Sequence, residues 1–553
     1  TVNDEIPNGR SSITGNFTVE EAKDLANILK AGKLPAPARI IQEEVVGPSL
    51  GQESITQGLR SFLLAFLLVL VYMVFYYNRA GLVADLALVV NIFFIFGVLA
   101  SLGAVLTLPG IAGIVLTLGM AVDANVIIYE RILDETRAGK GIRLAIEDGY
   151  KNAYSAIIDG NVTTLLTGIV LYVFGTGPIQ GFATTLIIGI LSSLFTAIFI
   201  SRLIFNWMME KNKKLQFDNS VTRNAFQKLH IDFIGKRKIA YFISGSIILL
   251  GLISFGVRGL NFGIDFTGGR TYVIRFDRPV ESLNPVRNAL TAEFGETPEV
   301  KSFGPSTQIK VVTKYMIDDK SESTDSLIAQ KLFTALRPFY SIEMTPETFL
   351  TSTDDISSNI GILQSQNVGP TIASDIKRNA VLAIVFALLI IFIYIAIRFK
   401  RWQMGLGGVL ALFHDSIITI ALFSMFYNIL PFNMEIDQAF IAAILTIIGY
   451  SINDTVIIFD RIREYVGLHP KKELGTNMND AINSTIARTV NTAGTTLVVL
   501  LSIFIFGGEI IRGFTFALLV GILVGTYSSV FVASPIAYDT IGWSERRKAR
   551  KKK

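Results

Sequence analysis

The sequence has no cysteine and only three histidines among its 553 residues. The absence of cysteine excludes disulfide bonds, thiolate catalysis and cysteine-ligated metals, and the scarcity of histidine argues against a zinc site. Charged residues are also few, at 17%, whereas 51% of the residues are hydrophobic and the mean hydropathy is +0.50. This composition is too apolar for a soluble enzyme of this size and indicates a polytopic membrane protein.

The chain carries a formal net charge of +5, part of which comes from the C-terminal tail ERRKARKKK. In a membrane protein such a tail is typical of a cytosolic segment that faces anionic lipid, so we expect contact with membrane lipid and no nucleic-acid binding. The chain starts at Thr1, without a methionine or a signal peptide, inside what reads as a folded domain. We therefore expect an N-terminal truncation.

Eleven apolar segments of the sequence are long enough to cross a bilayer. They lie at about 59–77, 81–101, 111–130, 157–175, 182–207, 239–256, 379–398, 405–427, 438–459, 487–506 and 513–539. Of the two soluble blocks, the second has the mixed strand-like and helix-like pattern of a small ferredoxin-like domain. The predicted fold class is therefore a polytopic α-helical membrane protein with soluble α+β domains.

The short loops that are rich in lysine and arginine all fall on one side when the eleven spans are threaded alternately. That side is predicted to be the cytosol, and both soluble blocks are predicted to face the periplasm. The predicted division of the chain is a remnant of a first periplasmic domain at 1–54, a transmembrane repeat at 55–207, a cytosolic linker at 208–238, a single span at 239–257, a periplasmic α+β domain at 258–375, a second transmembrane repeat at 376–540 and a basic cytosolic tail at 541–553.

The two transmembrane halves are copies of each other. Gly119–Ile132 (GMAVDANVIIYERI) matches Gly449–Ile462 (GYSINDTVIIFDRI), and Thr163–Leu165 matches Thr495–Leu497. Two parallel copies imply pseudo-two-fold symmetry about the membrane normal, with functional sites at the seam between the halves. The same symmetry predicts a twelfth span and more outer domain upstream of Thr1.

The repeated stretch carries an aspartate inside an apolar span, Asp123 in the first copy and Asp454 in the second. An ionisable group inside a membrane is costly and is a functional candidate by default. A buried carboxylate that alternates between its charged and neutral forms is a proton carrier; the alternative is that both residues bond neighbouring helices or lie near a water-filled vestibule. Asp123 aligns with Asn453 and Asp454 aligns with Ala124, so we expect the two carboxylates to play unlike roles.

Arg488 begins the eleventh span, and the first copy has Ala156 at the matching position. A cation close to Asp454 would favour the charged carboxylate, and a shift of the helix could release it. The alternative is an arginine that extends to the cytosolic interface. His414 and Asp415 form a second candidate, either as a proton relay or as a polar pair that bonds helix to helix.

The remaining polar residues inside the spans are secondary candidates for the same pathway. These are Asp85, Asp159, Asn125 and Asn453. Four charged residues at the exits of the spans are predicted to form interfacial ion pairs rather than to carry protons. They are Glu130, Arg131, Asp460 and Arg461.

Several motifs carry a specific resemblance to a known family. FTVEEAKDLANILKAGKLPAP, VGPSLGQESITQG and VDANVIIYERI resemble SecD, whereas FGIDFTGG, ALFHDS and GYSINDTVIIFDRIRE resemble SecF. The chain is thus similar to natural SecD–SecF fusions of the bacterial Sec translocon, which belong to the resistance-nodulation-division superfamily. The Gly-Leu-Asp-Leu-x-Gly-Gly junction expected early in SecD is absent, and this fits the expected truncation.

The resemblance implies an inner-membrane factor that uses the proton-motive force, without covalent chemistry, to promote preprotein translocation and release on the periplasmic side. The implied partners are the SecYEG channel, the SecA ATPase, the unfolded preprotein, YajC and YidC. No cofactor is expected, because protons are the coupling ion. Asp123, Asp454 and Arg488 match the proton-pathway residues of the family.

Two other functional classes stay open. A proton-driven exporter of lipid or small hydrophobic molecules from the same superfamily is disfavoured by the second soluble block, which is small for a substrate-binding porter domain. A passive scaffold would stabilise the translocon without any coupling to protons.

Overall fold

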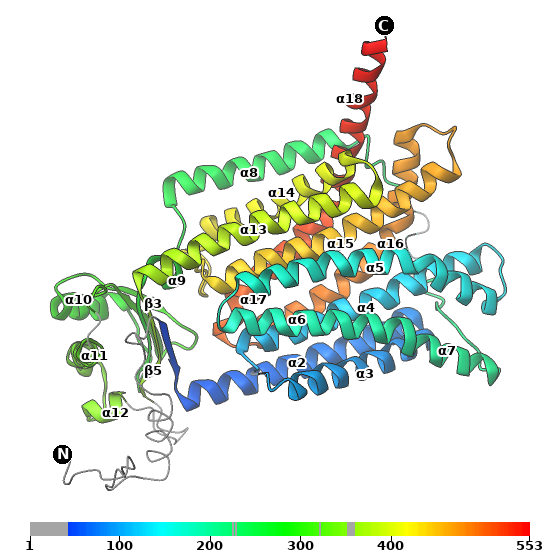
Figure 1. Ribbon diagram of the computed structural model, residues 1–553. Helices are drawn as coiled ribbons and strands as arrows, with labels where there is room; N and C mark the ends of the chain where they lie inside the picture. Colours follow the sequence, from blue (N-terminus) through cyan, green and yellow to red (C-terminus); the bar gives the residue numbers. More distant parts are fainter. Residues whose placement is uncertain are drawn as a thin grey trace, which may run out of the picture.

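A computed structural model describes residues 42–104, 106–223, 226, 229–319, 322–350 and 360–552 of the chain. Long helices form a bundle, and a small α+β domain lies at one end of it (Figure 1). Most of the first predicted soluble block, residues 1–41, lies outside the described residues.

Within the described residues, eleven helices are long and apolar enough to cross a membrane, and each predicted span coincides with one of them. The first half comprises α2 (Pro48–Tyr77), α3 (Arg79–Ser101), α4 (Leu108–Arg137), α5 (Ile142–Phe174) and α6 (Pro178–Phe195), which continues through the π-helical turn η1 (Thr196–Ile200) into α7 (Ser201–Glu210). The second half comprises α8 (Arg237–Arg258), α13 (Pro370–Phe399), α14 (Trp402–Phe426), α15 (Gln438–Leu468), α16 (Leu474–Phe506) and α17 (Glu509–Ser528), which continues through η4 (Ser529–Ala533) into α18 (Ser534–Lys552).

Helices α4 and α15, which carry the repeated stretch, form the centre of the bundle. In each of them 89% of the apolar window is buried, compared with 17% in the peripheral α8. Helix α4 packs against α5, α6 and α16, and α15 packs against α5, α16 and α17. Each central helix therefore contacts both halves of the chain, and the seam between the halves runs between them.

Two glycines at equivalent positions of the repeat allow the closest helix approaches within each half. Gly189 of α6 lies against Thr117 of α4, and Gly521 of α17 lies against Ile447 of α15, so that an added Cβ would collide with the facing side chain. Small residues at such contacts bring helix backbones together, which is the main source of packing energy between helices in lipid.

The α+β domain contains β2 (Gly269–Arg275), α10 (Leu283–Phe294), β3 (Glu299–Ser302), β4 (Gln308–Thr313), α11 (Glu322–Leu336) and β5 (Gly361–Val368), with the short helices α9 (Ile264–Thr267), η2 (Arg337–Phe339) and α12 (Pro346–Leu350). The strands pair antiparallel in the order β5-β2-β4-β3, which confirms the predicted ferredoxin-like topology. Alternation along β2 turns Tyr272 and Ile274 towards the core under α10 and α11 and turns Val273 to the opposite face, towards the bundle.

A fifth strand, β1 (Gln42–Val46), extends this sheet beside β5, a pairing that the sequence did not predict. Each of the two strands runs into a Gly-Pro step that opens the next long helix, α2 after β1 and α13 after β5. The register places Glu44 opposite Gln366, which is its counterpart in the repeat. The pseudo-two-fold axis therefore passes through this strand pair, and the sheet joins both halves of the bundle.

The connections with many lysines and arginines share the end of the bundle opposite the α+β domain, as predicted, and α18 also projects from that end (Figure 1). We refer to it as the basic end and to the other as the domain end.

Ion pairs fix the α+β domain to the bundle. Glu435, in the connection before α15, accepts from Lys310 at 2.5 Å and from Lys301 at 3.4 Å. Burial opposes the charged form of this carboxyl, but the two lysines outweigh burial and lower the pKa of Glu435. Burial and the neighbouring Asp265 raise the pKa of Asp437, which caps α15, to about 7.

We expect Gly521→Ala to destabilise the protein by about 1–3 kcal/mol, because the added methyl group must displace Ile447 from a packed contact. Gly494→Ala is the matched control, since an added Cβ there meets no atom within 4 Å and replacing a mid-helix glycine stabilises by about 0.5–1 kcal/mol. Thermal midpoints of the purified variants in detergent would measure both effects. Equal midpoints for the two variants would contradict this account of the packing.

We expect Asp437→Asn to raise the thermal midpoint more at pH 8 than at pH 4.5. Because the folded-state pKa is raised to about 7 from the model value 3.8, the stability that this carboxyl contributes is fully present below its ordinary pKa and is lost as pH rises towards 7. Asparagine keeps the helix cap and cannot ionise. Asp318→Asn, at an exposed position, is the control, and a gain that did not change with pH would contradict the prediction.

Candidate functional site

The two repeated aspartates and the predicted arginine meet at the centre of the seam. Arg488 of α16 lies between Asp123 of α4 and Asp454 of α15, with Nη2 3.0 Å from Asp123 Oδ1 and Nη1 3.2 Å from Asp454 Oδ1. All three side chains are buried, and Asp454 is only 2% exposed. One guanidinium is therefore shared by two carboxylates that come from different halves of the chain.

Asn453 completes this centre, because its Nδ2 donates to Asp123 Oδ2 at 2.6 Å. It is the repeat counterpart of Asp123, so the two residues touch each other across the pseudo-two-fold axis. Gly160 of α5 leaves the room that the Asn453 side chain occupies, since a Cβ at this position would collide with Asn453 Oδ1. Asn453 thus acts in the centre itself, although the sequence ranked it second.

The hydrogen bonding of the centre is incomplete within the described residues. Asp454 Oδ2 and Arg488 Nε are buried and have no hydrogen-bond partner there, and the contact from Nη1 to Asp454 is an ion pair without hydrogen-bond alignment. With both carboxylates ionised the three side chains carry one net negative charge, and one proton makes the set neutral. Asp454 Oδ2 can take that proton without losing a hydrogen bond.

His414 and Asp415 of α14 lie in a separate cluster. Nδ1 of the imidazole faces Asp415 Oδ1 and Nε2 faces Ser244 of α8, each at 2.9 Å. Asp415 Oδ2 accepts from Ser451 of α15 at 2.6 Å and from Ser528 of α17 at 2.8 Å. The pair thus bonds four helices together, which favours the helix-to-helix alternative over a proton relay.

Asp159 of α5 is also held away from the centre. It accepts from Arg398 Nε at 2.7 and 2.8 Å and from the Tyr394 hydroxyl at 2.8 Å, both on α13. Its repeat counterpart Asn491 has the matching contact, because the Tyr72 hydroxyl of α2 donates to Asn491 Oδ1 at 2.8 Å. These two side chains bind the outer helix of one half to the other half.

The two remaining secondary candidates do not reach the centre by any described hydrogen bond. Asn125 donates to the Ala121 carbonyl of its own helix at 3.4 Å. Asp85 of α3 has a buried Oδ1 without a partner among the described residues. Neither contact links the side chain to Asp123, Asp454 or Arg488.

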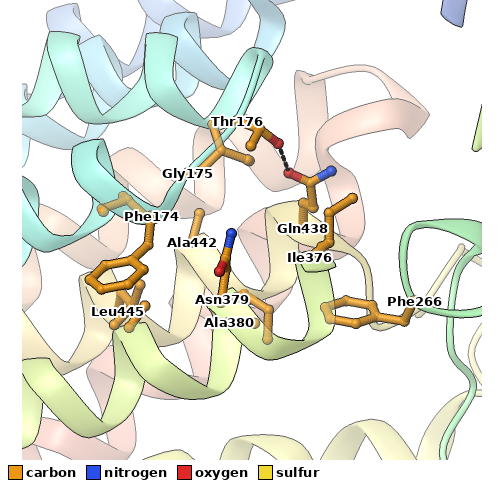
Figure 2. A pocket seen from close by; sticks show the side chains of 14 residues that line it. Phe174, Gly175, Thr176, Phe266, Ile376, Asn379, Ala380, Gln438, Ala442 and Leu445 are labelled. Carbon is orange, nitrogen blue, oxygen red and sulfur yellow. Dashed lines mark hydrogen bonds between the residues drawn. The ribbon is translucent and has the colours of Figure 1, made fainter. Parts of the chain in front are cut away.

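An apolar cavity lies at the domain end of the seam, between α5, α13 and α15 (Figure 2). Thr176 and Gln438 are hydrogen-bonded at 2.7 Å at its edge. None of the residues that line it is ionisable, so this cavity has no group that could carry a proton. Groups of three or more possible metal ligands are also absent from the part of the chain that the structure describes.

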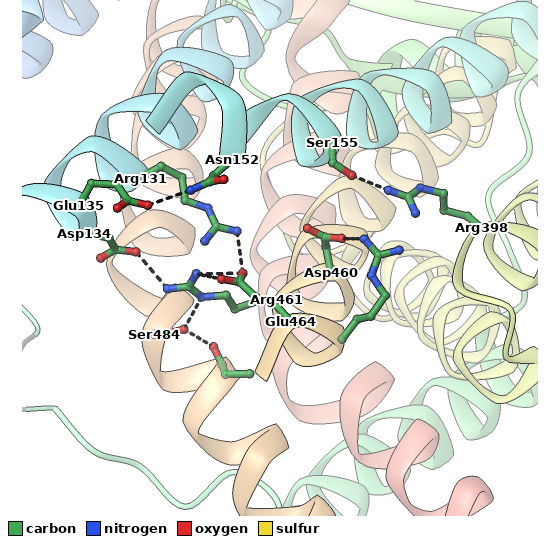
Figure 3. Close-up of polar contacts among 12 residues, drawn as sticks. Arg131, Asp134, Glu135, Asn152, Ser155, Arg398, Asp460, Arg461, Glu464 and Ser484 are labelled. Atoms are coloured by element: carbon green, nitrogen blue, oxygen red, sulfur yellow. Dashed lines mark hydrogen bonds and ion pairs between the residues drawn. The ribbon is translucent and has the colours of Figure 1, made fainter. Parts of the chain in front are cut away.

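Ion pairs cross the seam at the basic end (Figure 3). Arg131 binds Glu464 at 3.1 Å, Arg461 binds Asp134 at 3.0 Å, and Asp460 pairs with Arg463. The prediction of interfacial ion pairs is therefore confirmed for Arg131, Asp460 and Arg461. It is wrong for Glu130, because among the described residues this carboxylate accepts from neutral partners, the Tyr77 hydroxyl at 3.0 Å and Asn491 at 3.4 Å.

Sequence reasoning missed three parts of this arrangement: the partner of Asp159, the neutral surroundings of Glu130 and the crossing of the ion pairs between the halves. Alignment of the two copies could have indicated the last, since Arg131 corresponds to Arg461 and Asp134 to Glu464. Long-range partners such as Arg398 have no counterpart signal in the repeat, because Tyr76 occupies the matching position.

Comparisons with known families agree with the repeat. The family described as "Protein export membrane protein SecD/SecF, C-terminal" matches residues 28–211 and 348–543, which are the two halves of the bundle. The "SecD/SecF GG Motif" matches residues 253–280, and the "SecDF, P1 head subdomain" matches residues 1–36.

Among individual relatives, the protein translocase subunit SecDF of Bacillus subtilis is 34% identical over 557 residues, covering 97% of this chain and 71% of the relative. The crystal structure of SecDF from Thermus thermophilus, titled a translocon-associated membrane protein, is similar with a TM-score of 0.80 and 34% identity, over 96% of this chain and 68% of that chain. SecDF in a "Super-membrane-facing form" gives a TM-score of 0.69 at 34% identity, over 97% and 68% of the two chains. The chain therefore belongs to the SecD/SecF family of protein export membrane proteins.

Proposed function

We propose that the chain is an accessory subunit of the Sec protein translocase that uses the proton-motive force to promote preprotein translocation and release on the periplasmic side. The names of its relatives support the role in protein translocation. The coupling to protons rests on one observation, the buried guanidinium of Arg488 that is shared by Asp123 and Asp454 from different halves.

In the proposed mechanism a proton binds one of the two carboxylates and removes its attraction for Arg488. The guanidinium then has one charged partner, so the balance between two packings of the halves changes. Asp454 is the better acceptor, because its Oδ2 has no hydrogen-bond partner among the described residues, whereas Asp123 is bound by Asn453 as well as by Arg488. Release of the proton to the other side restores the ion pair.

Movement at the seam reaches the α+β domain through rigid connections. Helix α2 follows β1 and helix α13 follows β5, each after one glycine, and the two strands are paired in one sheet. A rotation of one half against the other thus acts directly on the sheet. The two relatives of known structure, one of them in a form with its own name, support a family that adopts more than one arrangement.

We place the basic end of the bundle in the cytosol and the α+β domain in the periplasm, on the basis of the positive loops. The partners that follow are the SecYEG channel, SecA and the unfolded preprotein, with YajC and YidC as further candidates. The mechanism uses protons alone and no covalent step.

We expect Asp123→Asn and Asp454→Asn each to abolish the stimulation of preprotein release by a proton gradient, because an amide cannot exchange a proton at neutral pH. Inverted membrane vesicles that carry the full-length protein with the Sec channel would provide the measurement, with and without an ionophore. Retention of gradient-dependent release by both variants would rule out the coupling.

Asp415→Asn is the matched control for this experiment, since it alters a buried carboxylate of the helix-to-helix cluster. We expect this variant to lose stability but to keep the ratio of release with and without the gradient. Export of a hydrophobic dye by the same vesicles would instead support the exporter of the same superfamily.

We expect Arg488→Met to destabilise the protein more than Asp123→Asn. Removing the shared cation leaves two buried carboxylates without a counter-charge, and breaking a buried pair in this way costs about 3–5 kcal/mol, whereas Asp123→Asn leaves Arg488 with Asp454. Thermal midpoints of the purified variants at pH 8 would rank them, and the order would reverse if Arg488 did not balance both carboxylates.

A further inference from the structure

A second buried region adjoins the centre on its basic side. A cavity of about 390 Å³, counting the space at its open mouth, is lined by Arg488 at one end and by Arg131, Asp134 and Arg461 at the other. Glu130 lines the same cavity, two helical turns from Asp123 on α4. Polar walls and a space of this size suit water, so the cavity connects the centre with the basic end.

Glu130 is suited to receive a proton in this cavity. The carboxylate accepts from the Tyr77 hydroxyl of α2 and from Asn491 of α16, and its second oxygen, Oε2, has no described hydrogen bond. Asn491 lies one turn beyond Arg488 on the same helix. The charged groups around Glu130 are Asp134 and Arg137 on its own helix and Arg461 on α15. None of them forms a described ion pair with Glu130, so its charge is not already committed.

The mouth of the cavity is crossed by two reciprocal ion pairs (Figure 3). Arg131 of α4 binds Glu464 of α15, and Arg461 of α15 binds Asp134 of α4, so each half holds the other by the same pair of positions. The two arginine side chains are only 15% and 13% exposed, whereas the carboxylates are 39% and 42% exposed. Half-exposed pairs of this kind are weak and can exchange with water.

We propose that this cavity is the cytosolic half of the proton path, that Glu130 is its proton acceptor, and that the two reciprocal ion pairs are the gate that closes it. This inference rests on the proposed function. A proton that leaves the Asp123–Arg488–Asp454 centre passes to a Glu130 oxygen and then to the cytosol when the gate opens. Rotation of the halves breaks both ion pairs together, because the pseudo-two-fold axis relates them.

The gate can be tested without any proton gradient, because the chain has no cysteine of its own. Ala156→Cys places a single thiol in the wall of the cavity, at a side chain that is 1% exposed. A charged, membrane-impermeant thiol reagent added at the basic end of reconstituted vesicles should label it slowly. We expect Arg131→Ala with Arg461→Ala to raise the labelling rate by about tenfold, as a mostly closed equilibrium becomes open.

Two further variants make the result specific. Ala138→Cys, exposed after the end of α4, should be labelled at the same rate in both backgrounds. The exchanged pair Arg131→Glu with Glu464→Arg restores the attraction across the seam and should keep labelling of Ala156→Cys slow. Equal rates for Ala156→Cys with intact and broken ion pairs would overturn the gate.

The role of Glu130 is tested by proton flux into the same vesicles under an imposed membrane potential. We expect Glu130→Gln to lower the flux by about tenfold or more, in the range of a lost proton-transfer group, and Glu130→Asp to retain most of it. Glu147→Gln, at an exposed site near the same end, should leave the flux unchanged. A merely structural role would be disturbed more by the shortened aspartate than by glutamine, and that order would overturn the proposal.

The two levels of inference fail in different ways. Unchanged flux in Glu130→Gln together with lost flux in Asp123→Asn would overturn Glu130 as the acceptor and leave the coupling centre intact. Unchanged flux in both would remove the proposed function and the role of Glu130 with it. The labelling rates still decide in either case whether the reciprocal ion pairs close the cavity.

Discussion

The structure depends on one electrostatic constraint: a buried guanidinium must be balanced by carboxylates that belong to different halves of the chain. Arg488 and Asp454 come from the second half and Asp123 from the first, and all three are buried. The effective desolvation penalty of each buried ion is several kcal/mol, so separating the halves at this point is costly while the charges persist. A single proton changes that cost more than any change in apolar packing of similar size, which makes the seam sensitive to protonation.

Contacts between equivalent residues continue along the seam on both sides of this centre. At the domain end β1 pairs with its counterpart β5, and at the basic end the positions of Arg131 and Asp134 are exchanged with those of Arg461 and Glu464. The contacts at the basic end are half-exposed ion pairs, each worth about 0–1 kcal/mol. Strong buried charge at the centre and weak exchangeable pairs at the surface together allow the halves to rotate without loss of the fold.

Much of this architecture could be predicted from the sequence, because the signals were local. Each of the eleven spans is a continuous apolar run, and the ferredoxin-like order follows from the alternation of strands and helices between Gly269 and Val368. Asp123, Asp454 and Arg488 were found as charges inside such runs. The partners of Asp159 and Glu130 could not be found in this way, since Arg398, Tyr394, Tyr77 and Asn491 are distant in sequence and reach them only through the packing of α2, α13 and α16. Strand β1 was predicted as a strand, but its pairing depends on the approach of the two halves.

The asymmetry of the centre matters because the rest of the seam is symmetric. If the copies were identical, Asp123 would face a second aspartate in place of Asn453, and Ala156 would be a second arginine. Two equal sites would then share the same axis, and protonation of either would have the same effect. With one arginine, one carboxylate fixed by an amide and one with a free oxygen, the two carboxylates differ in their readiness to bind a proton. The duplication thus supplies two halves that can move against each other, and the divergence at Asn453 and Arg488 makes their seam a single proton site.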